Sequence, residues 1–321
     1  MNEEYLWNGG GEPDPEIVHL EETLAAFRHR PRMPQEWRPR RAVRWRWAAA
    51  AAAVLVTGVI GVRALMPPPQ PTAWQVDRAA GPARVGRKDA AISMRVDRGD
   101  VLRTGIGAQL ELLADDVGRV ELGPQSELRA SSGKGLSLTR GKLHAFIWAP
   151  PREFVVETPS STTVDLGCEY TLDVDNAGNG TVRVSLGWVA FQFHDRESFI
   201  PAGARCATRK ATGPGIPVFE DAPQALQSAL TQFERGDLSA LPRILETARA
   251  EDGLTLWHLL SRTQPKDRAA VFARFAALVS LPKEVTAEKV ENLDAHAIDL
   301  CWDALKLENT EWWRGWERRW N

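Results

Sequence analysis

The sequence predicts a mixed fold with one N-terminal transmembrane helix, an all-β domain of the sandwich or solenoid-like kind, and an all-α C-terminal bundle. Three observations support this fold. Residues 47–66 are apolar over a length that can cross a bilayer, residues 76–215 contain short alternating apolar segments separated by glycines, and residues 220–321 place apolar side chains at helical spacing. The part beyond residue 70 is long enough for two domains with hydrophobic cores.

The N-terminal segment, residues 1–33, is predicted to form one short amphipathic helix. Asp14 can cap a helix that begins at Pro15, and Pro31 ends it. So short a segment cannot bury its apolar stripe alone. It either packs as a small hairpin on itself or on the membrane, or it enters a groove of a cytoplasmic partner. We favour the partner, and the candidate partner-binding residues are Tyr5, Leu6, Trp7, Ile17, Leu20, Leu24 and Phe27.

The apolar run at residues 47–66 is predicted to be a transmembrane helix. Twenty residues at about 1.5 Å each reach roughly 30 Å, which matches a bilayer core. Eight arginines lie between residues 28 and 46, whereas only Arg78 and Arg84 lie in the first twenty residues after the run. Because cytoplasmic flanks carry the excess of positive charge, we expect the N-terminus in the cytoplasm. The C-terminal domains would then be periplasmic, and the chain would lie in the inner membrane.

Two linkers flank this run, a basic one at residues 34–46 and a proline-rich one at 67–75. A signal peptide is the alternative to a span, but its charged region normally lies close to Met1. The arginines could also suggest nucleic acid, yet membrane topology and contact with anionic lipid explain them better. We therefore expect no direct binding to nucleic acid. Six alanines and Arg63 make the run only moderately hydrophobic, so the orientation depends mainly on the arginines.

Residues 76–215 are predicted to form the β domain, because apolar and polar residues alternate over short segments that end at glycines and turn pairs. A hairpin turn is expected at residues 175–180. The predicted strands are 109–113, 118–122, 126–130, 136–139, 143–148, 154–158, 162–166, 170–174, 181–186 and 189–193. Short strands at this spacing are typical of a sandwich or of a stacked, solenoid-like jelly roll.

Residues 220–321 are predicted to be helical. The expected helices are 224–235, 238–250, 253–261, 266–279, 287–290 and 293–306. Their short links favour a bundle or a stack of helix pairs. The tryptophan-rich tail at 311–320 either docks on this bundle or anchors a partner or the membrane interface.

No set of residues has the spacing of a catalytic, metal or cofactor site. The histidines beyond the span are scattered and match no metal-ligand motif; they are His144, His194, His258 and His296. Residues 173–176 begin like a calcium loop, but Val184 stands where that loop needs a glutamate. We therefore expect neither enzyme activity nor a cofactor.

Short motifs in the β domain resemble those of the FecR-like family. GDVLRTG at residues 99–105 is similar to the G-D-x-L-x-T-G opening of FecR-like domains, and LGPQSELR at 122–129 is similar to their next motif. Further pieces follow in the family's order: GKL at 141–143, FVVETP at 154–159, DLG at 165–167, GWV at 187–189 and PAG at 201–203. A span ahead of the β domain also matches the family's usual layout.

The resemblance implies a transmembrane regulator of the anti-sigma type. In this family a cytoplasmic segment binds an extracytoplasmic-function (ECF) sigma factor, and a periplasmic domain receives a signal. Iron-transport members end in a small α/β domain that contacts an outer-membrane receptor. Residues 220–321 do not show that pattern, so we expect a different periplasmic partner. The alternative is a membrane-tethered periplasmic module that binds a ligand or scaffolds the envelope without controlling a sigma factor.

Two cysteines depart from the family's pattern. Cys168 follows Gly167, where the family usually has threonine, and Cys206 follows the PAG motif. Two unusual cysteines in one exported domain suggest a disulfide. It would close a loop of about 38 residues and add about 3–4 kcal/mol in the chain-entropy account. The alternative is two buried, unpaired thiols.

Overall fold

The computed structural model describes residues 18–19, 74–131 and 133–307 of a chain that divides into two compact units, Met1–Pro68 and Pro69–Asn321. The second unit contains all described residues except Val18 and His19, which are helical. The predicted span at residues 47–66, the basic linker before it and the tryptophan-rich tail lie outside the described residues. Within the part that is described, no helix is both long and apolar enough to cross a membrane.

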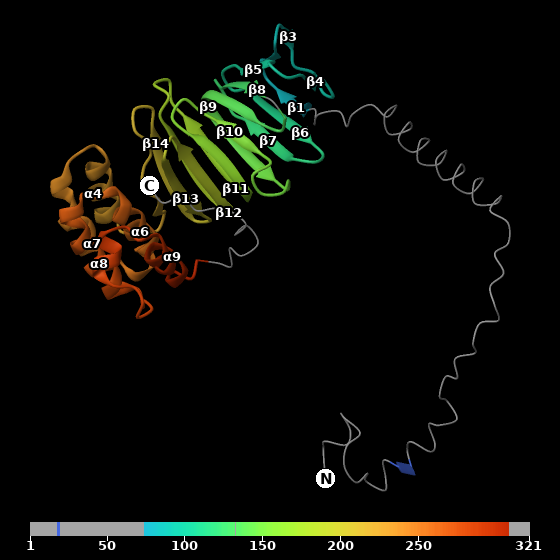
Figure 1. Ribbon diagram of the computed structural model, residues 1–321. Coiled ribbons are helices and arrows are strands. Elements are labelled where there is room, and N and C mark those ends of the chain that lie inside the picture. The colour runs from blue at the N-terminus through green and yellow to red at the C-terminus, as the bar shows by residue number, and fades with distance from the viewer. Residues whose placement is uncertain (1–17, 20–73, 132, 308–321) are drawn as a thin grey trace, which may run out of the picture. The chain divides into compact units, whose positions relative to one another are not determined.

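The β domain is one continuous hydrogen-bonded sheet, to which the described residues contribute sixteen strands (Figure 1). The strands are β1 (Trp74–Ala80), β2 (Ala83–Val85), β3 (Lys88–Asp89), β4 (Arg95–Val96), β5 (Val101–Thr104), β6 (Gln109–Ala114), β7 (Gly118–Leu122), β8 (Glu127–Ala130), β9 (Leu136–Ile147), β10 (Val155–Glu157), β11 (Thr162–Val174), β12 (Gly180–Phe193), β13 (Arg196–Pro201), β14 (Ala204–Arg209), β15 (Gly213–Pro214) and β16 (Val218–Phe219). The main path through the sheet is β15-β14-β12-β11-β10-β9-β7-β6-β1-β4. A second path, β3-β2-β5-β8, joins it at β9.

Three long strands belong to two sets of pairings each. The first part of β9 pairs with β8 and β10, and its second part pairs with β7 and β11. Strand β11 pairs first with β10 and then with β9, while β12 pairs with β14 near its start and with β13 near its end. The sheet therefore bends along these strands, so that two strand sets share β9, β11 and β12, as expected for a sandwich-like or solenoid-like domain.

The sequence predicted each long strand as two shorter ones, and this was wrong. The predicted breaks fall at glycines with positive φ, namely Gly141, Gly167 and Gly187. These glycines bend the strands without ending them, and the pairing of β11 with β12 shifts its register beside Gly167. The bend at Gly187 also requires close contact, because a Cβ atom there would lie 2.0 Å from the carbonyl oxygen of Gly167. Only glycine fits this position.

Most of the other predicted strands are confirmed, and the hairpin turn between β11 and β12 lies where it was expected. Strand β1 begins at Trp74, so the last two residues of the predicted linker at 67–75 belong to the sheet. Along β6 the side chains alternate as the period-two pattern requires: Leu110, Leu112 and Ala114 are buried, while Gln109 is exposed.

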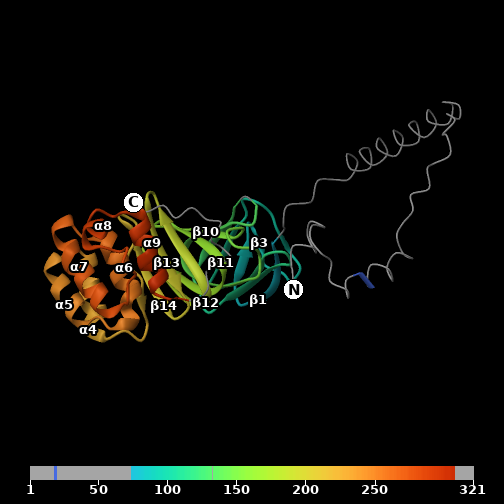
Figure 2. The same ribbon diagram turned by 60° about the horizontal axis from the view of Figure 1, so that its bottom comes forward.

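The C-terminal region is helical, which confirms the β and helical parts of the predicted mixed fold. Its helices are α4 (Gln224–Glu234), η1 (Leu238–Ala240), α5 (Leu241–Thr247), η2 (Ala250–Asp252), α6 (Gly253–Arg262), α7 (Pro265–Leu278), α8 (Ala287–Glu291) and α9 (Ala295–Ala304). The predicted helix at 238–250 is shorter and is flanked by two 3-10 turns. Asp294 caps α9 by accepting a hydrogen bond from the Ala297 N–H, so this helix starts two residues later than predicted. Figures 1 and 2 both place the helices beside β13 and β14, and β1 and β3 at the opposite end of the sheet.

The predicted disulfide between Cys168 and Cys206 is not formed. Both are free, buried thiols, as is Cys301. Cys168 lies on β11 and Cys206 on β14, and β12 runs between these two strands. Two strand spacings amount to about 10 Å, whereas a disulfide needs Cα atoms within about 7 Å. The alternative of buried, unpaired thiols is the correct one.

Candidate functional site at the junction of sheet and helices

None of the predicted partner-binding residues lies in the described part of the chain. They are Tyr5, Leu6, Trp7, Ile17, Leu20, Leu24 and Phe27. Their role remains a prediction from sequence. Within the described part of the chain, the candidate site lies where β13, β14 and β15 meet α4 and α6.

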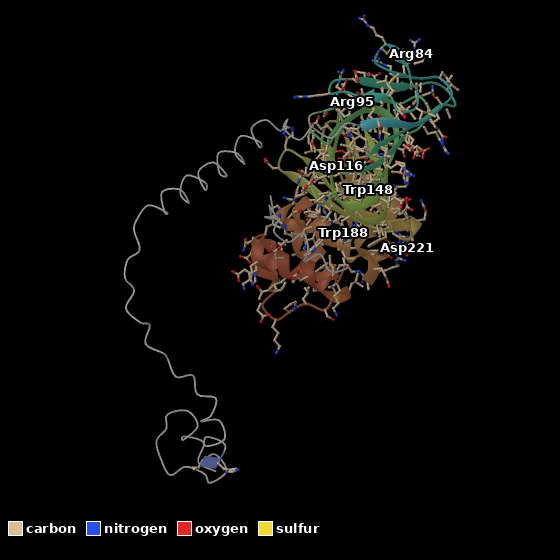
Figure 3. The ribbon with its side chains drawn as sticks, turned by 90° about the vertical axis from the view of Figure 1, so that its right-hand side faces the viewer. Arg84, Arg95, Asp116, Trp148, Trp188 and Asp221 are labelled. Atoms are coloured by element: carbon tan, nitrogen blue, oxygen red, sulfur yellow. The ribbon has the colours of Figure 1, made fainter. Side chains whose placement is uncertain are left out.

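Four aromatic residues hold the sheet and the helices together at this junction. Trp302 of α9 lies 5.7 Å from Trp188 of β12, 5.5 Å from Phe199 of β13 and 4.7 Å from Trp257 of α6, measured between ring centroids. All four side chains are buried. Figure 3 labels Trp188, which lies between the strands and the helices. Tilted and edge-to-face pairs of this kind contribute about 0.5–1.5 kcal/mol each beyond their buried area, so these rings stabilise the contact between the sheet and the helices.

A buried histidine of α6 is hydrogen-bonded to the backbone of β13 at this junction. The backbone N–H of Phe199 donates to Nε2 of His258 over 3.1 Å, and Nδ1 of His258 lies 2.9 Å from the Leu254 carbonyl oxygen. Because Nε2 accepts a hydrogen bond from a backbone N–H, the hydrogen of the neutral ring must sit on Nδ1 and point to the Leu254 carbonyl oxygen. Burial lowers the pKa of His258 to about 3, so the ring stays neutral at physiological pH.

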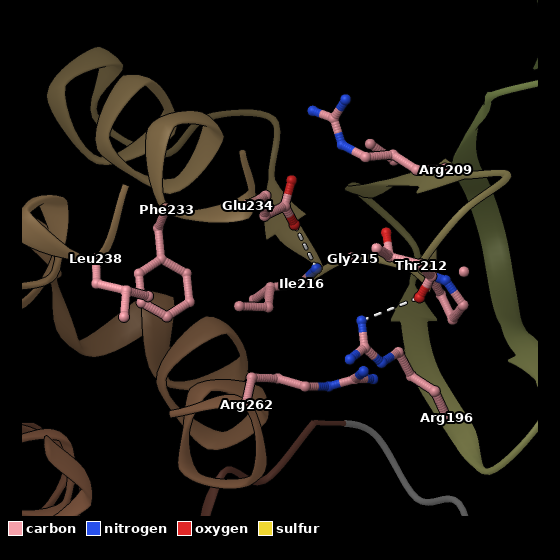
Figure 4. Close-up of a pocket in the computed structure, with 12 residues that line it drawn as sticks. Arg196, Arg209, Thr212, Gly215, Ile216, Phe233, Glu234, Leu238 and Arg262 are labelled. Atoms are coloured by element: carbon pink, nitrogen blue, oxygen red, sulfur yellow. Dashed lines mark hydrogen bonds between the residues drawn. The ribbon is translucent and has the colours of Figure 1, made fainter. Parts of the chain in front are cut away.

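A small pocket opens beside this contact, and we call it the junction pocket (Figure 4). Its volume is about 190 Å³. It is lined by Arg196, Ala207, Arg209, Thr212, Gly213, Pro214, Gly215, Ile216, Phe233, Glu234, Leu238 and Arg262. The lining residues come from β13, β14, β15, α4, η1 and α6, so the pocket exists only because the helices pack against this end of the sheet.

Three arginines and one glutamate set the charge of the junction pocket. Two hydrogen bonds fix the Arg262 side chain. Its Nη2 donates to the Glu197 carbonyl oxygen over 2.7 Å and to Ser198 Oγ over 3.2 Å. Burial, and next the charge of Arg196, lower the pKa of Arg262 to about 10, so it remains a cation at neutral pH. Arg196 donates to the Thr212 carbonyl oxygen over 3.0 Å.

Glu234 is the carboxylate of this lining. Its Oε1 accepts a hydrogen bond of 2.6 Å from the Ile216 N–H, which ties α4 to the loop after β15. Burial raises the pKa of Glu234, while that hydrogen bond and the arginines nearby oppose the rise. The pocket thus combines a net positive charge with apolar walls from Phe233 and Leu238.

Such an arrangement can hold an anion, but it offers no set of groups for bond-breaking chemistry. In the described ranges, no three His, Cys, Asp or Glu side chains gather as metal ligands would. The sequence could not reveal this site, because Arg196, Arg209 and Arg262 are far apart in the chain and form no motif. The one sequence signal is Arg262, which ends helix α6 and is the one Lys, Arg, Asp or Glu residue in that helix.

Comparisons with known proteins identify one segment of the chain. Residues 100–190 match the model of the FecR family, described as FecR protein. The resemblance predicted from short motifs is thereby confirmed for a segment that begins just before β5 and ends within β12. No curated protein matches the chain.

Two crystal structures of a candidate anti-sigma factor from Parabacteroides distasonis ATCC 8503 are similar to part of the chain. Their identities are 13% and 14%; they cover 46% and 45% of this chain and 74% and 73% of their own. Both TM-scores are 0.33. Similarity at this level establishes neither a shared fold nor a shared function.

Proposed function

We propose that this protein is a single-pass regulator in the inner membrane that controls an ECF-type sigma factor in response to a periplasmic signal. The observation that carries the proposal is the FecR match at residues 100–190, which follows the apolar run at 47–66 in the sequence. A FecR segment placed after a membrane anchor, with a basic flank before that anchor, fits a receptor whose short N-terminal part acts inside the cell.

In this proposal, residues 1–33 bind the sigma factor. The apolar stripe of Ile17, Leu20, Leu24 and Phe27 would enter a groove of the sigma factor, as amphipathic helices commonly do, and Tyr5, Leu6 and Trp7 would extend the contact. The β domain and the helices would lie in the periplasm and receive the signal from a partner there.

The described contacts provide a physical route between the two C-terminal domains. Strand β12 holds the last residues of the FecR segment and continues to the junction, where Ala190 pairs with Phe199. The Phe199 N–H is bonded in turn to His258 of α6. A change in how the helices pack would therefore act directly on a strand of the FecR segment.

The test is co-purification of the sigma factor with the full chain from solubilised membranes. Leu20→Glu with Leu24→Glu places charges on the apolar stripe, so we expect the sigma factor to be lost. Glu21→Gln with Glu22→Gln changes residues outside the stripe and is the matched control. Equal recovery with the stripe variant and with the unchanged protein would contradict the proposal.

The junction pocket favours a second candidate function, a membrane-tethered periplasmic module that binds a ligand and does not control transcription. In that case the N-terminal segment would only set topology. Replacing residues 1–33 with an unrelated sequence, while keeping the basic linker, would then leave the protein's cellular function unchanged. Loss of function after this replacement would exclude the second candidate.

A further inference from the structure

The junction pocket has more positive charge than its own residues neutralise. Three arginines line it, against one glutamate, Glu234. In the described part of the chain, Arg196, Arg209 and Arg262 form no ion pair within 4.0 Å, and the Arg209 side chain makes no hydrogen bond either. Some arginines elsewhere in the sheet form ion pairs, as Arg183 does with Glu220 at 3.1 Å. The junction pocket therefore brings three arginines without an ion pair to one place.

Two of these guanidinium groups are directed toward one another. Figure 4 shows Arg262 extending from α6 toward Arg196, which extends from the start of β13. Each is already fixed by bonds to neutral oxygens, Arg196 to the Thr212 carbonyl and Arg262 to the Glu197 carbonyl and Ser198 Oγ. Two fixed cations that face each other repel, and an anion between them removes that repulsion.

The opposite wall of the pocket is apolar and partly open. Phe233 and Ile216 are buried, and Leu238 is 47% exposed. A volume of about 190 Å³ is slightly larger than a cavity of roughly 150 Å³ that accommodates benzene. The space therefore fits an apolar group no larger than a single ring or a short chain.

The geometry points to a binding site for a small organic carboxylate in the junction pocket. Its carboxylate lies between Arg196 and Arg262, and its apolar group lies against Phe233 and Leu238. A planar carboxylate matches the forked donors of arginine better than a point charge does. This assignment does not depend on sigma-factor control, because all the lining residues follow the predicted span in the sequence.

Calorimetric titration of the full chain in detergent tests this inference, with phenylacetate as the probe and ionic strength held constant. We expect saturable binding of one phenylacetate per chain, at least about tenfold tighter than that of the neutral phenylacetamide. Arg196→Gln should weaken phenylacetate binding about tenfold, while Arg98→Gln, an exposed arginine outside the pocket, should not change it.

A second variant tests the contribution of the apolar wall to phenylacetate affinity separately from that of the arginines. Leu238→Ser changes a half-exposed residue at the mouth, so the protein should stay folded, and phenylacetate should bind several-fold more weakly. The inference is overturned if phenylacetate does not saturate, if Arg196→Gln binds as tightly as the unchanged protein, or if phenylacetamide binds equally well. Inorganic phosphate that binds as tightly as phenylacetate would also overturn it, since the apolar wall would then contribute nothing.

Discussion

At the residue scale, two buried ionisable side chains have pKa values far from their ordinary range. His258 lies at the junction and is 1% exposed, and Asp165 of β11 lies inside the sheet domain and is fully buried. Burial lowers the pKa of His258 to about 3 and raises that of Asp165 to about 7. Both residues accept hydrogen bonds from backbone N–H groups, so each combines a local structural role with an electrostatic cost.

His258→Phe should lower the free energy of unfolding by about 2 kcal/mol at pH 7.5, because the buried N–H of Phe199 loses its acceptor. The folded-state pKa of His258 lies below that of free imidazole, so its contribution is present above about pH 6.5 and is lost as the pH falls toward 3. The free energy of unfolding of the His258→Phe variant should therefore fall less between about pH 6.5 and pH 3 than that of the unchanged protein.

Urea unfolding of the full chain in detergent provides the measurement for this change. His144→Phe is the control, because His144 lies on the sheet surface with 39% side-chain exposure and pairs only with Glu169 there. We expect a loss below about 0.5 kcal/mol for the control. Equal losses for the two variants would show that the bond to Phe199 does not stabilise the junction.

Asp165→Asn should make unfolding less dependent on pH. The raised pKa of Asp165 means that the folded protein binds this proton more tightly than the unfolded chain, so stability falls as the pH rises from about 4 through about 7. Asparagine can still accept the Gly167 N–H, which lies 2.8 Å from Asp165 Oδ1. As the pH rises from 5 to 8, the free energy of unfolding of the variant should increase by up to about 3 kcal/mol relative to that of the unchanged protein.

Asp175→Asn is the matched control in the same strand hairpin. Hydrogen bonds from Asn179 lower the pKa of Asp175, so this carboxyl remains ionised from pH 5 to pH 8. Its replacement should shift stability by the same amount at both pH values. The account of Asp165 fails if its variant and the unchanged protein show parallel pH profiles.

At the element scale, the bends in β9, β11 and β12 determine the shape of the β domain. Each bend places a glycine where the strand passes from one set of neighbours to the other. The last part of β12, beyond Gly187, then pairs with β13 and reaches the helices. The bends thus connect the FecR segment to the junction.

Gly187→Ala should be strongly destabilising, by more than about 3 kcal/mol, since a left-handed backbone costs about 1–2 kcal/mol and the new methyl would collide with Gly167. Gly99→Ala is the matched control, because Gly99 also has positive φ, +90°, but nothing lies within 4 Å of the added Cβ. Its loss should be limited to the backbone cost. Thermal unfolding of both variants measures the difference, and similar losses would mean that the close contact at Gly187 is unimportant.

Prediction from sequence succeeded where the pattern is local and failed where tertiary contacts decide. Alternating residues identified β6 and β7, and helical spacing identified α4, α6 and α7. Gly141, Gly167 and Gly187 were interpreted as strand ends, because a glycine bend and a glycine turn look alike in sequence. Cys168 and Cys206 were paired on rarity alone, since the intervening β12 cannot be seen without the pairing order.

At the scale of the whole molecule, the proposed function treats the chain as a sensor part joined to a short effector segment. The described part contains the segment that matches the FecR family, an aromatic junction between sheet and helices, and a pocket lined by arginines without an ion pair. The pocket could not be predicted, since six elements contribute its lining. The proposed effector residues are predicted from a local pattern, a capped apolar stripe, and await an experimental test.

Transcription from a sigma-dependent promoter is the most direct test of the central proposal that this chain controls a sigma factor. The promoter recognised by the candidate ECF-type sigma factor is fused to a reporter. Four strains are compared, which carry the unchanged chain, a complete deletion, Leu20→Glu with Leu24→Glu, or Glu21→Gln with Glu22→Gln. The account predicts that the stripe variant changes reporter output in the same direction as the deletion, while Glu21→Gln with Glu22→Gln leaves it unchanged. Reporter output that is identical in all four strains would contradict the account.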